Sequence, residues 1–352
     1  MKRPLVPALL IALCLIASCS DEGVTASGTT TEERSTTTTA APAADVPVPS
    51  AGCTAAASAA IDGDKVTLDV AGEERWYLIT APASTPGTPV PLVIDMHGLA
   101  EGAQIHSKMS NSPVLAKSAG FIDVLPNGTG DPLKWNADPT VTPNHDLEFF
   151  TKMLDDLEAQ RCVDTSRVYA MGLSYGAIMS SFLACKMTDR IAAIAPVAGV
   201  TVRDDCVPDR PVPLIGFHGT ADPILFFNGG VGDLSSVLGG PAPDPAVTTT
   251  TIAVDLNGPG YPHNVATWAK RNGCSATPTD TKVTPEIIHR VYSCPKGADV
   301  EFYIIVGGGH AWPGSQFSKA IASVVGPTNM DIDATKLAWE FLSKFRLPAK
   351  KK

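Results

Sequence analysis

The stretch Val168-Tyr-Ala-Met-Gly-Leu-Ser174-Tyr-Gly176 decides the fold of this 352-residue chain. It opens with an apolar run typical of a buried strand, and apolar residues at helical spacing follow from Ala177 to Leu183. Between them, Gly172, Ser174 and Gly176 fit the pattern G-x-S-x-G. Such a turn holds its serine in a strained conformation, and glycines flank it because a Cβ there would collide with neighbouring elements. The stretch predicts that Ser174 is a nucleophile; an ordinary glycine-rich turn is the alternative.

Apolar runs recur along the chain and alternate with helical patterns, the clearest over Asp146–Gln160 and the last over Asp333–Phe345. Runs of this kind are typical of strands covered on both faces, so we expect an α/β fold with a mainly parallel sheet and helices on both faces. Lys65–Val70 and Arg75–Thr80 alternate apolar and polar residues, which predicts an antiparallel N-terminal edge. The predicted buried strands lie in Pro91–Gly98, Phe121–Leu125, Val168–Met171, Ala192–Val197, Leu214–Phe217 and Val300–Val306.

The N-terminal region predicts export. Lys2 and Arg3 precede an apolar run from Leu5 to Ile16, which is the arrangement of a signal peptide. The run ends in Ile16-Ala-Ser-Cys19, which resembles the lipobox of bacterial lipoprotein signal peptides, where the cysteine is lipidated. We therefore expect residues 1–19 to be a lipoprotein signal peptide and Cys19 to carry a lipid anchor. The alternative is a plain secretory signal; either way the protein is extracytoplasmic, as a bacterial membrane lipoprotein or a secreted protein.

The rest of the chain divides into a tether and one domain. Residues 20–50 are rich in Thr, Ala and Pro and cannot bury enough apolar surface to fold, so we expect a disordered tether. Residues 51–348 show neither an internal repeat nor a second boundary and are expected to form one domain. Within it, about 227–263 is an irregular insertion rich in Gly, Pro and Thr. It is either a lid or substrate-binding element or a surface insertion without a role.

Charge and cysteine content limit the possible partners. The formal net charge of −9 leaves no electrostatic footprint for nucleic acid. Apart from Cys14 and Cys19, six cysteines remain, and an even number in an oxidising compartment predicts three disulfides with fifteen possible connectivities. Proximity favours two local pairs, which leaves one long-range pair. A zinc site is the alternative, but the sequence holds no C-x-x-C or H-E-x-x-H, so we expect no metal. The favoured pairs are Cys185–Cys206, Cys274–Cys294 and Cys53–Cys162.

A serine nucleophile needs a histidine base that a carboxylate orients, and both follow Ser174 in the chain. The predicted strand at Leu214–Phe217 leads to Asp222, and the one at Val300–Val306 leads to His310 after three glycines. The order Ser, Asp, His, each after a strand, predicts a triad. Taken alone, Asp222 is more typical of an Asp-Pro turn than of a triad, and the alternative for His310 is a surface loop.

An acyl-transfer site also needs donors for the oxyanion. One expected donor is the backbone N–H of Tyr175, directly after the nucleophile. The second should lie in the loop that follows an earlier strand, and we assign it to the backbone N–H of Leu99. Trp312, beside the candidate base, and Trp135 are candidates for substrate contact, with packing as the alternative.

Five blocks of sequence, in order, resemble the polyhydroxybutyrate depolymerase and feruloyl esterase group, over roughly residues 53–346. The resemblance implies an α/β-hydrolase fold and a secreted serine esterase with Ser174, Asp222 and His310 as the triad, and it needs no cofactor. It also agrees with the two local disulfides. Ala177 departs from the family, where many members have a second glycine, and the insertion is longer than the family core. The blocks are His97-Gly98, Trp135-Asn136, Arg167–Gly176, His218–Pro223 and Gly309–Gly314.

The sequence therefore predicts an extracytoplasmic serine esterase that cleaves carboxylic esters through an acyl-enzyme. The first prediction for its activity is polyhydroxybutyrate depolymerase-like. A feruloyl or acetylxylan-type esterase on plant polysaccharide is the alternative. From a different class, a surface-tethered binding protein on the same scaffold would keep the fold without turnover, and peptidase activity is a third possibility. The sequence leaves the oligomeric state open.

Overall fold

The computed structural model describes residues 46–349, apart from residue 57 and residues 241–252. In these residues ten strands form one sheet with the order β1-β2-β4-β3-β5-β6-β7-β10-β9-β8. The six strands from β4 to β10 in this order are parallel, and an antiparallel hairpin lies at each edge. The strands are β1 Ile61–Val70, β2 Glu73–Ala81, β3 Val90–Met96, β4 Ile122–Pro126, β5 Val163–Leu173, β6 Ala193–Val197, β7 Leu214–Gly219, β8 Thr279–Thr284, β9 Ile287–Tyr292 and β10 Val300–Ile305.

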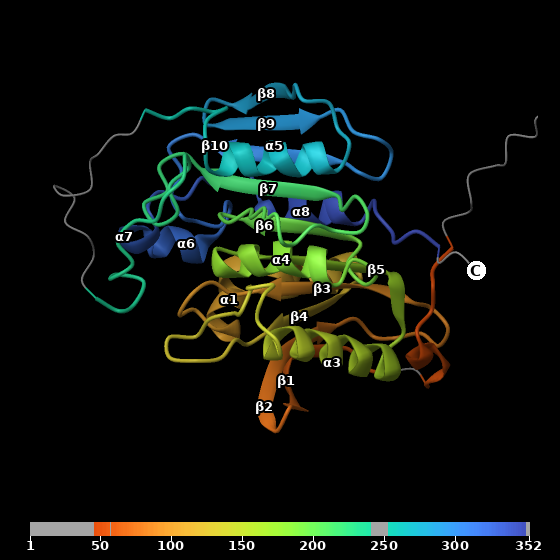
Figure 1. Ribbon diagram of the computed structural model, residues 1–352. Helices are drawn as coiled ribbons and strands as arrows, with labels where there is room; N and C mark the ends of the chain where they lie inside the picture. The colour runs from red at the N-terminus through yellow and green to blue at the C-terminus, as the bar shows by residue number, and fades with distance from the viewer. Residues whose placement is uncertain (1–45, 57, 241–252, 350–352) are drawn as a thin grey trace, which may run out of the picture. The chain divides into compact units, whose positions relative to one another are not determined.

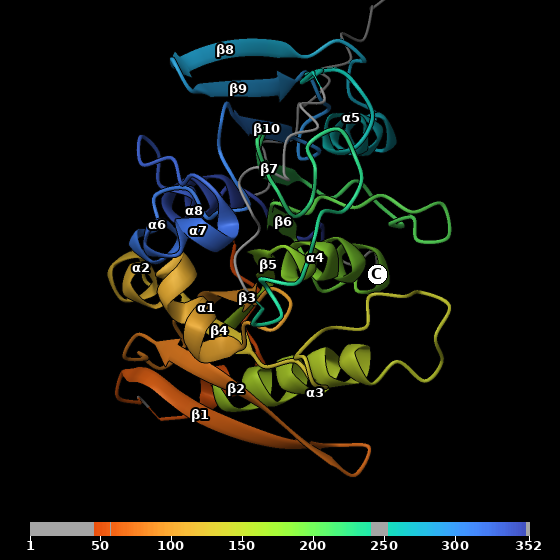
Figure 2. The same cartoon turned by 90° about the vertical axis from the view of Figure 1, so that its left-hand side faces the viewer.

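Helices cover both faces of the sheet (Figures 1 and 2). On one face α3, α4 and α5 pack over the strands; α1, α2, α6, α7 and α8 lie on the other. The buried apolar side chains accordingly form two clusters, one on each face. Besides the 3-10 turn η1 Ala51–Thr54, the helices are α1 Ala103–Ser110, α2 Ser112–Ala119, α3 His145–Gln160, α4 Tyr175–Lys186, α5 Tyr261–Arg271, α6 Gln316–Ala320, α7 Ala322–Val325 and α8 Ala334–Leu342.

The predicted α/β sheet with an antiparallel N-terminal edge is confirmed. The predicted central helix agrees with α3, whose first turn is capped by the Asn144 side chain accepting from Leu147 N–H. The last helix begins after Asp333, whose side chain caps it, but ends at Leu342 rather than at Phe345. A second antiparallel hairpin, β8–β9, was not predicted, because β8 is exposed and mostly polar and so lacks an apolar run.

The described residues contain three disulfides, and they join the three predicted pairs, two of them local and one long-range. Cys53 and Cys162 are 109 positions apart and tie η1 to the residues just before β5. Cys185–Cys206 and Cys274–Cys294 close local loops after α4 and α5. Loop closure of this kind removes conformational freedom from the unfolded chain. Cys19, the predicted signal peptide and residues 20–45 of the predicted tether lie outside the described residues.

The predicted insertion at 227–263 overlaps the first turn of α5, so its irregular part ends at Gly260. Its two ends meet: Asn228 and Asp255 exchange side-chain-to-backbone hydrogen bonds of 2.7 and 2.9 Å. Tyr261 N–H donates to Phe227 O at 3.0 Å. Residues 241–252, within the insertion, are not described. Among the described helices, none has the length and apolar character needed to cross a membrane.

Candidate active site

Ser174 lies on a sharp turn between β5 and α4. Its backbone has φ 55° and ψ −116°, a strained conformation for a residue with a side chain. A Cβ on Gly176 would lie 2.0 Å from Met96 O, and one on Gly172 would lie 2.5 Å from the same oxygen. Both flanking positions therefore require glycine because the end of β3 approaches them closely. Ser174 itself is only half buried, so its hydroxyl is within reach of a substrate.

Asp222 and His310 come together at the carboxyl ends of β7 and β10, which are neighbours in the sheet. His310 Nδ1–H donates to Asp222 Oδ2 at 2.8 Å, and both side chains are buried. Burial by itself would raise the pKa of Asp222, but the neighbouring imidazoles of His310 and His218 hold it well below its ordinary value. A charged Asp222 thus fixes the orientation of His310 and leaves Nε2 of that ring as the proton acceptor.

A second histidine shares this carboxylate. His218 Nε2 lies 3.2 Å from Asp222 Oδ2 and 2.9 Å from Leu225 O. The His218 ring stacks on Tyr261 with the ring centroids 3.8 Å apart, which places it against the base of the insertion. Asp222 Oδ1 accepts from the backbone N–H groups of Ile224 and Leu225, both at 2.8 Å. These contacts place His218 as a second partner of Asp222, beside His310.

Of the three glycines before His310, Gly308 and Gly309 are required by close packing, whereas Gly307 has a φ of 74° with open space around its Cα. A Cβ on Gly309 would lie 2.2 Å from Val325 O, and one on Gly219 would lie 2.2 Å from Gly308 O. His310 N–H donates to Val325 O at 2.6 Å, which pins the backbone that carries the ring. The loops after β7 and β10 therefore pack directly on each other, and this contact sets the Asp222–His310 pair.

In the described residues no hydrogen bond joins the Ser174 hydroxyl to His310. The two side chains share the carboxyl-end edge of the sheet, on β5 and β10, with β6 and β7 between them. In enzymes without substrate such serine–histidine contacts are often long and shorten when substrate binds. The serine–histidine half of the triad therefore remains a proposal, whereas the Asp222–His310 half is present as a hydrogen bond.

The segment His97–Leu99, which we call the oxyanion loop, lies directly beside Ser174. A Cβ on Gly98 would be 3.4 Å from Ser174 Cβ. Gly98 O faces His97 Nδ1 at 2.6 Å, and His97 Nε2 accepts from Gly128 N–H at 2.8 Å, so His97 carries its proton on Nδ1. Burial lowers the pKa of His97 to about 4, which keeps the ring neutral. Within the described chain, the N–H of Leu99 donates to no acceptor.

The two tryptophans suggested as substrate contacts are buried, with exposed fractions of 2% for Trp135 and 1% for Trp312. Trp135 Nε1–H donates to His97 O at 2.8 Å, and its ring lies against the imidazole of His97. Trp312 Nε1–H donates to Thr335 Oγ1 at 2.9 Å. Since neither indole has surface to offer a ligand, the expectation of substrate contact is wrong for this structure and the packing alternative holds.

Beneath the oxyanion loop lies a buried cluster of polar side chains that sequence reasoning missed. His106 bonds to Asp95 Oδ1 through Nε2 at 2.8 Å and to Glu101 Oε1 through Nδ1 at 3.1 Å. Burial would lower the pKa of His106, but the two carboxylates outweigh it and raise this pKa to about 10. His106 is therefore an imidazolium at neutral pH, held between two anions.

A serine extends this cluster to a second aspartate. Ser112 Oγ lies 2.8 Å from Asp95 Oδ2 and 2.9 Å from Asp123 Oδ2, yet a hydroxyl has only one hydrogen to donate. Burial and the nearby Asp95 raise the pKa of Asp123 well above its ordinary value. The raised pKa favours a proton on Asp123, and with that proton the geometry is satisfied, because Asp123 then donates to Ser112 while Ser112 donates to Asp95.

The raised pKa of His106 predicts how stability depends on pH. The folded-state pKa of about 10 exceeds the ordinary value of 6.5, so the stabilisation is complete below about pH 6.5 and is lost as pH rises through about 10. We expect the melting temperature of the wild type to fall between pH 7 and 10. In His106→Gln it should be lower at pH 7 and should fall less steeply. Thermal unfolding by circular dichroism measures both, with the exposed His145→Gln as a control that keeps the wild-type slope. Parallel curves for wild type and His106→Gln would contradict the assignment.

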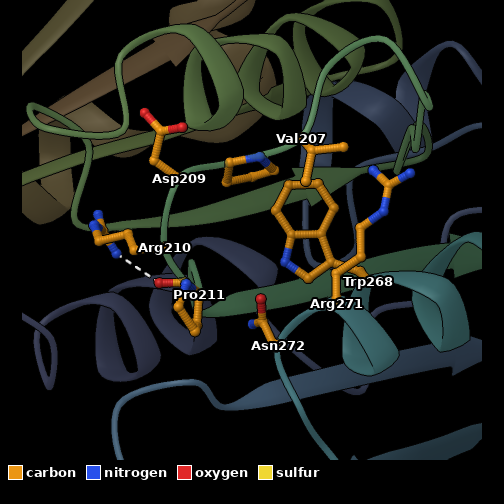
Figure 3. A pocket seen from close by; sticks show the side chains of 8 residues that line it. Val207, Asp209, Arg210, Pro211, Trp268, Arg271 and Asn272 are labelled. Carbon is orange, nitrogen blue, oxygen red and sulfur yellow. Dashed lines mark hydrogen bonds between the residues drawn. The ribbon is translucent and has the colours of Figure 1, made fainter.

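A cavity of about 180 Å³ lies away from this site, at the amino end of β7 and the carboxyl end of α5 (Figure 3). The two arginines that line it already have hydrogen-bond partners within the protein. The Arg210 guanidinium donates to three backbone carbonyls, and Arg271 donates to Arg203 O and Asp204. Trp268 in its wall is buried and donates to Val212 O at 2.8 Å. These contacts are structural, so we do not assign the cavity to the candidate active site.

Metal binding finds no support in the part of the chain that is described, since no group of three His, Cys, Asp or Glu side chains there could hold an ion. The six cysteines of this part are all in disulfides. The groups that the candidate site does present are a strained serine, a histidine–aspartate pair and backbone N–H donors at one edge of the sheet.

Comparison with known proteins agrees with this geometry. The prolyl oligopeptidase family matches residues 107–206, which is less than a third of the chain. Feruloyl esterase B of Piromyces equi is 30% identical over 78% of this chain, but the chain spans only 46% of that relative's length. The protein named "Putative esterase NocK" from Nocardia uniformis subsp. tsuyamanensis is 30% identical, over 78% of this chain and 80% of its own length.

A solved structure supports the fold independently. The acetyl xylan esterase from Aspergillus awamori superposes with a TM-score of 0.50 over 71% of this chain and 94% of its own, at 15% sequence identity. At that identity the likeness shows the fold alone, which is an α/β-hydrolase fold. Of these three names, one refers to feruloyl esters and one to acetyl esters of xylan, the third says only esterase, and none refers to polyhydroxybutyrate.

Proposed function

This chain belongs to the esterase family of the α/β-hydrolase fold, and from that premise we propose that it is an extracytoplasmic serine esterase acting on feruloyl or acetyl esters of plant polysaccharide. The observation that carries the proposal is the buried His310–Asp222 hydrogen bond of 2.8 Å, at the same sheet edge as the strained Ser174. An orienting carboxylate, a base and an exposed nucleophile in this order are what acyl transfer requires.

In the proposed mechanism, Ser174 Oγ attacks the ester carbonyl carbon while His310 Nε2 takes the hydroxyl proton. The charged Asp222 keeps the proton of His310 on Nδ1 and stabilises the imidazolium that forms. The backbone N–H groups of Tyr175 and Leu99 hold the oxyanion, and the start of α4 adds favourable potential for negative charge. His310 then gives its proton to the leaving alcohol, and water releases the acid from Ser174 by the reverse sequence.

The choice of substrate rests on the relatives. By their names, feruloyl esterase B acts on feruloyl esters and the acetyl xylan esterase on acetylated xylan, and these names support the feruloyl or acetylxylan alternative over the polyhydroxybutyrate prediction. The test is a comparison of kcat/KM for methyl ferulate, acetylated xylan and hydroxybutyrate oligomers. We expect at least a tenfold preference, about 1.4 kcal/mol, for one of the first two. A preference for hydroxybutyrate oligomers would sink the substrate assignment.

We also propose that the enzyme is anchored to the bacterial membrane through a lipid on Cys19, with the residues that follow Cys19 as the tether. The predicted end of the tether at residue 50 is wrong, because Val48 N–H donates to Asp164 Oδ1 at 3.0 Å and Ser50 is buried in the domain. The Ile16-Ala-Ser-Cys19 sequence and the unfoldable composition that follows support the anchor and its tether. The test is metabolic labelling with an alkyne fatty acid. Labelling that Cys19→Ser leaves unchanged would rule the anchor out.

A further inference from the structure

The oxyanion loop consists of two successive peptide units, and each of their N–H and C=O groups except one has a hydrogen-bond partner in the described chain. In the first unit, His97 O accepts from Trp135 Nε1–H at 2.8 Å, and Gly98 N–H donates to Glu101 Oε2 at 2.6 Å. In the second unit, Gly98 O lies 2.6 Å from the protonated Nδ1 of His97 and accepts from Glu101 N–H at 3.3 Å. The one remaining group is Leu99 N–H, which donates to no acceptor in the described chain.

This arrangement fixes the direction of the remaining group. A trans peptide points its N–H opposite to its C=O, so the contacts that hold Gly98 O also aim Leu99 N–H. Gly98 lies beside the nucleophile, since a Cβ there would be 3.4 Å from Ser174 Cβ and 3.3 Å from Glu101 Oε2. A carboxylate therefore lies next to the place where negative charge would develop, which by itself would oppose catalysis.

The buried cluster offsets that charge and fixes the carboxylate. Glu101 Oε1 and Oε2 lie 3.1 and 3.2 Å from Nδ1 of the imidazolium of His106, which Asp95 holds from the other side at 2.8 Å. The exposed fraction of the His106 side chain is 0%, and that of the Glu101 side chain is 9%. Burying four ionisable groups is costly. The cluster holds Ser112 at the start of α2 and, through Glu101, the Gly98 N–H of the oxyanion loop.

We propose that Glu101 is a positioning residue, which orients the Leu99 N–H for the oxyanion. Its carboxylate accepts a hydrogen bond from Gly98 N–H, and Trp135 donates to His97 O in the same peptide unit. The inference rests on the proposed esterase function and names the part of the chain that shapes its oxyanion site. His106 and Asp95 act through Glu101, whose position they fix.

Two isosteric changes separate the contact from the charge. Glu101→Gln keeps an oxygen for Gly98 N–H, and its amide can donate to a neutral His106, so the contact survives without the charge. Glu101→Asp keeps the charge beside His106 but is one methylene shorter, so it withdraws from Gly98. We expect kcat for methyl ferulate or p-nitrophenyl acetate to fall about 100-fold in Glu101→Asp, the effect of a displacement of about 1 Å. Glu101→Gln should stay within about fivefold of wild type on the same scale.

Three readouts distinguish positioning from mere support of the fold. In Glu101→Asp the KM should stay within about threefold, while affinity for a boronic acid that mimics the tetrahedral adduct falls in step with kcat. Glu148→Asp, at the exposed partner of His145, is the matched control and should change nothing. If Glu101→Asp does not fold, Trp135→Phe tests the inference instead, because it removes the Nε1–H that donates to His97 O. The expected loss in kcat is about tenfold.

A Glu101→Gln variant that loses as much kcat as Glu101→Asp would overturn the inference, as would wild-type kcat in Glu101→Asp or in a Trp135→Phe used in its place. These results leave the esterase proposal standing, because the wild type is active in each. A wild type that hydrolyses no ester overturns both together, and no variant is needed to see it.

Discussion

Replacing Ser174 with alanine is expected to lower kcat for ester hydrolysis by about 10⁶-fold, the loss typical of removing a serine nucleophile. The change removes the only atom that can form the acyl-enzyme, while the backbone strain at φ 55° and the flanking glycines remain. Because no buried group loses a partner, the melting temperature should stay close to that of the wild type. Hydrolysis of p-nitrophenyl acetate and of methyl ferulate measures the effect.

Ser118→Ala serves as the control, since Ser118 is an exposed serine whose hydroxyl bonds only to Leu115 O in the preceding turn. Its activity should equal that of the wild type. If Ser174→Ala and wild type hydrolyse both esters at the same rate, Ser174 is not the nucleophile. The binding-protein alternative would then account for the scaffold better than an enzyme does.

Asp222→Asn is expected to lower kcat by about 10⁴-fold without unfolding the protein. The asparagine oxygen can keep the backbone N–H groups of Ile224 and Leu225, so the turn after β7 survives. Its NH₂ group, however, faces His310 Nδ1, from which the carboxylate of the wild type accepts a hydrogen bond of 2.8 Å. His310 must then carry its proton on Nε2 and can no longer accept one from Ser174.

The matched control for this change is Asp205→Asn, which breaks an exposed ion pair with Arg203 and should leave kcat unaltered. The measurement is again kcat with methyl ferulate, followed by the pH dependence of kcat/KM. An Asp222→Asn enzyme within tenfold of wild type, beside an inactive Ser174→Ala, would mean that another group orients His310. His218, whose Nε2 lies 3.2 Å from the same carboxylate oxygen, would be the first residue to examine.

The features that depend on local sequence patterns could be predicted from the sequence. The apolar run and glycines around Ser174 predict the strand, turn and helix that the structure has, because a Cβ at Gly172 or Gly176 has no space. The order of Ser174, Asp222 and His310 after separate strands predicts that they share one sheet edge, since parallel strands end together.

The contacts that depend on distant segments could not be predicted in the same way. The sequence of α1 carries His106 among polar residues, and this pattern is also typical of an exposed helix. Only the packing of α1 against β2 and β4 brings His106 to Asp95. The first five residues of β8 are exposed and, apart from Val283, polar, so they lack an apolar run. Trp135 and Trp312 looked like ligand contacts because aromatic residues often are, yet the structure uses each as a buried donor.

Identification of the residue that carries the acyl group tests the central claim most directly. The purified protein would be mixed with a slowly hydrolysed feruloyl or acetyl ester, quenched in acid within the first turnover, and mapped by peptide mass spectrometry. The account predicts one acyl group per chain on Ser174, which is absent in Ser174→Ala and accumulates far more slowly in His310→Ala. An acyl group on another residue, or ester hydrolysis that proceeds with no acylated peptide at all, would contradict it.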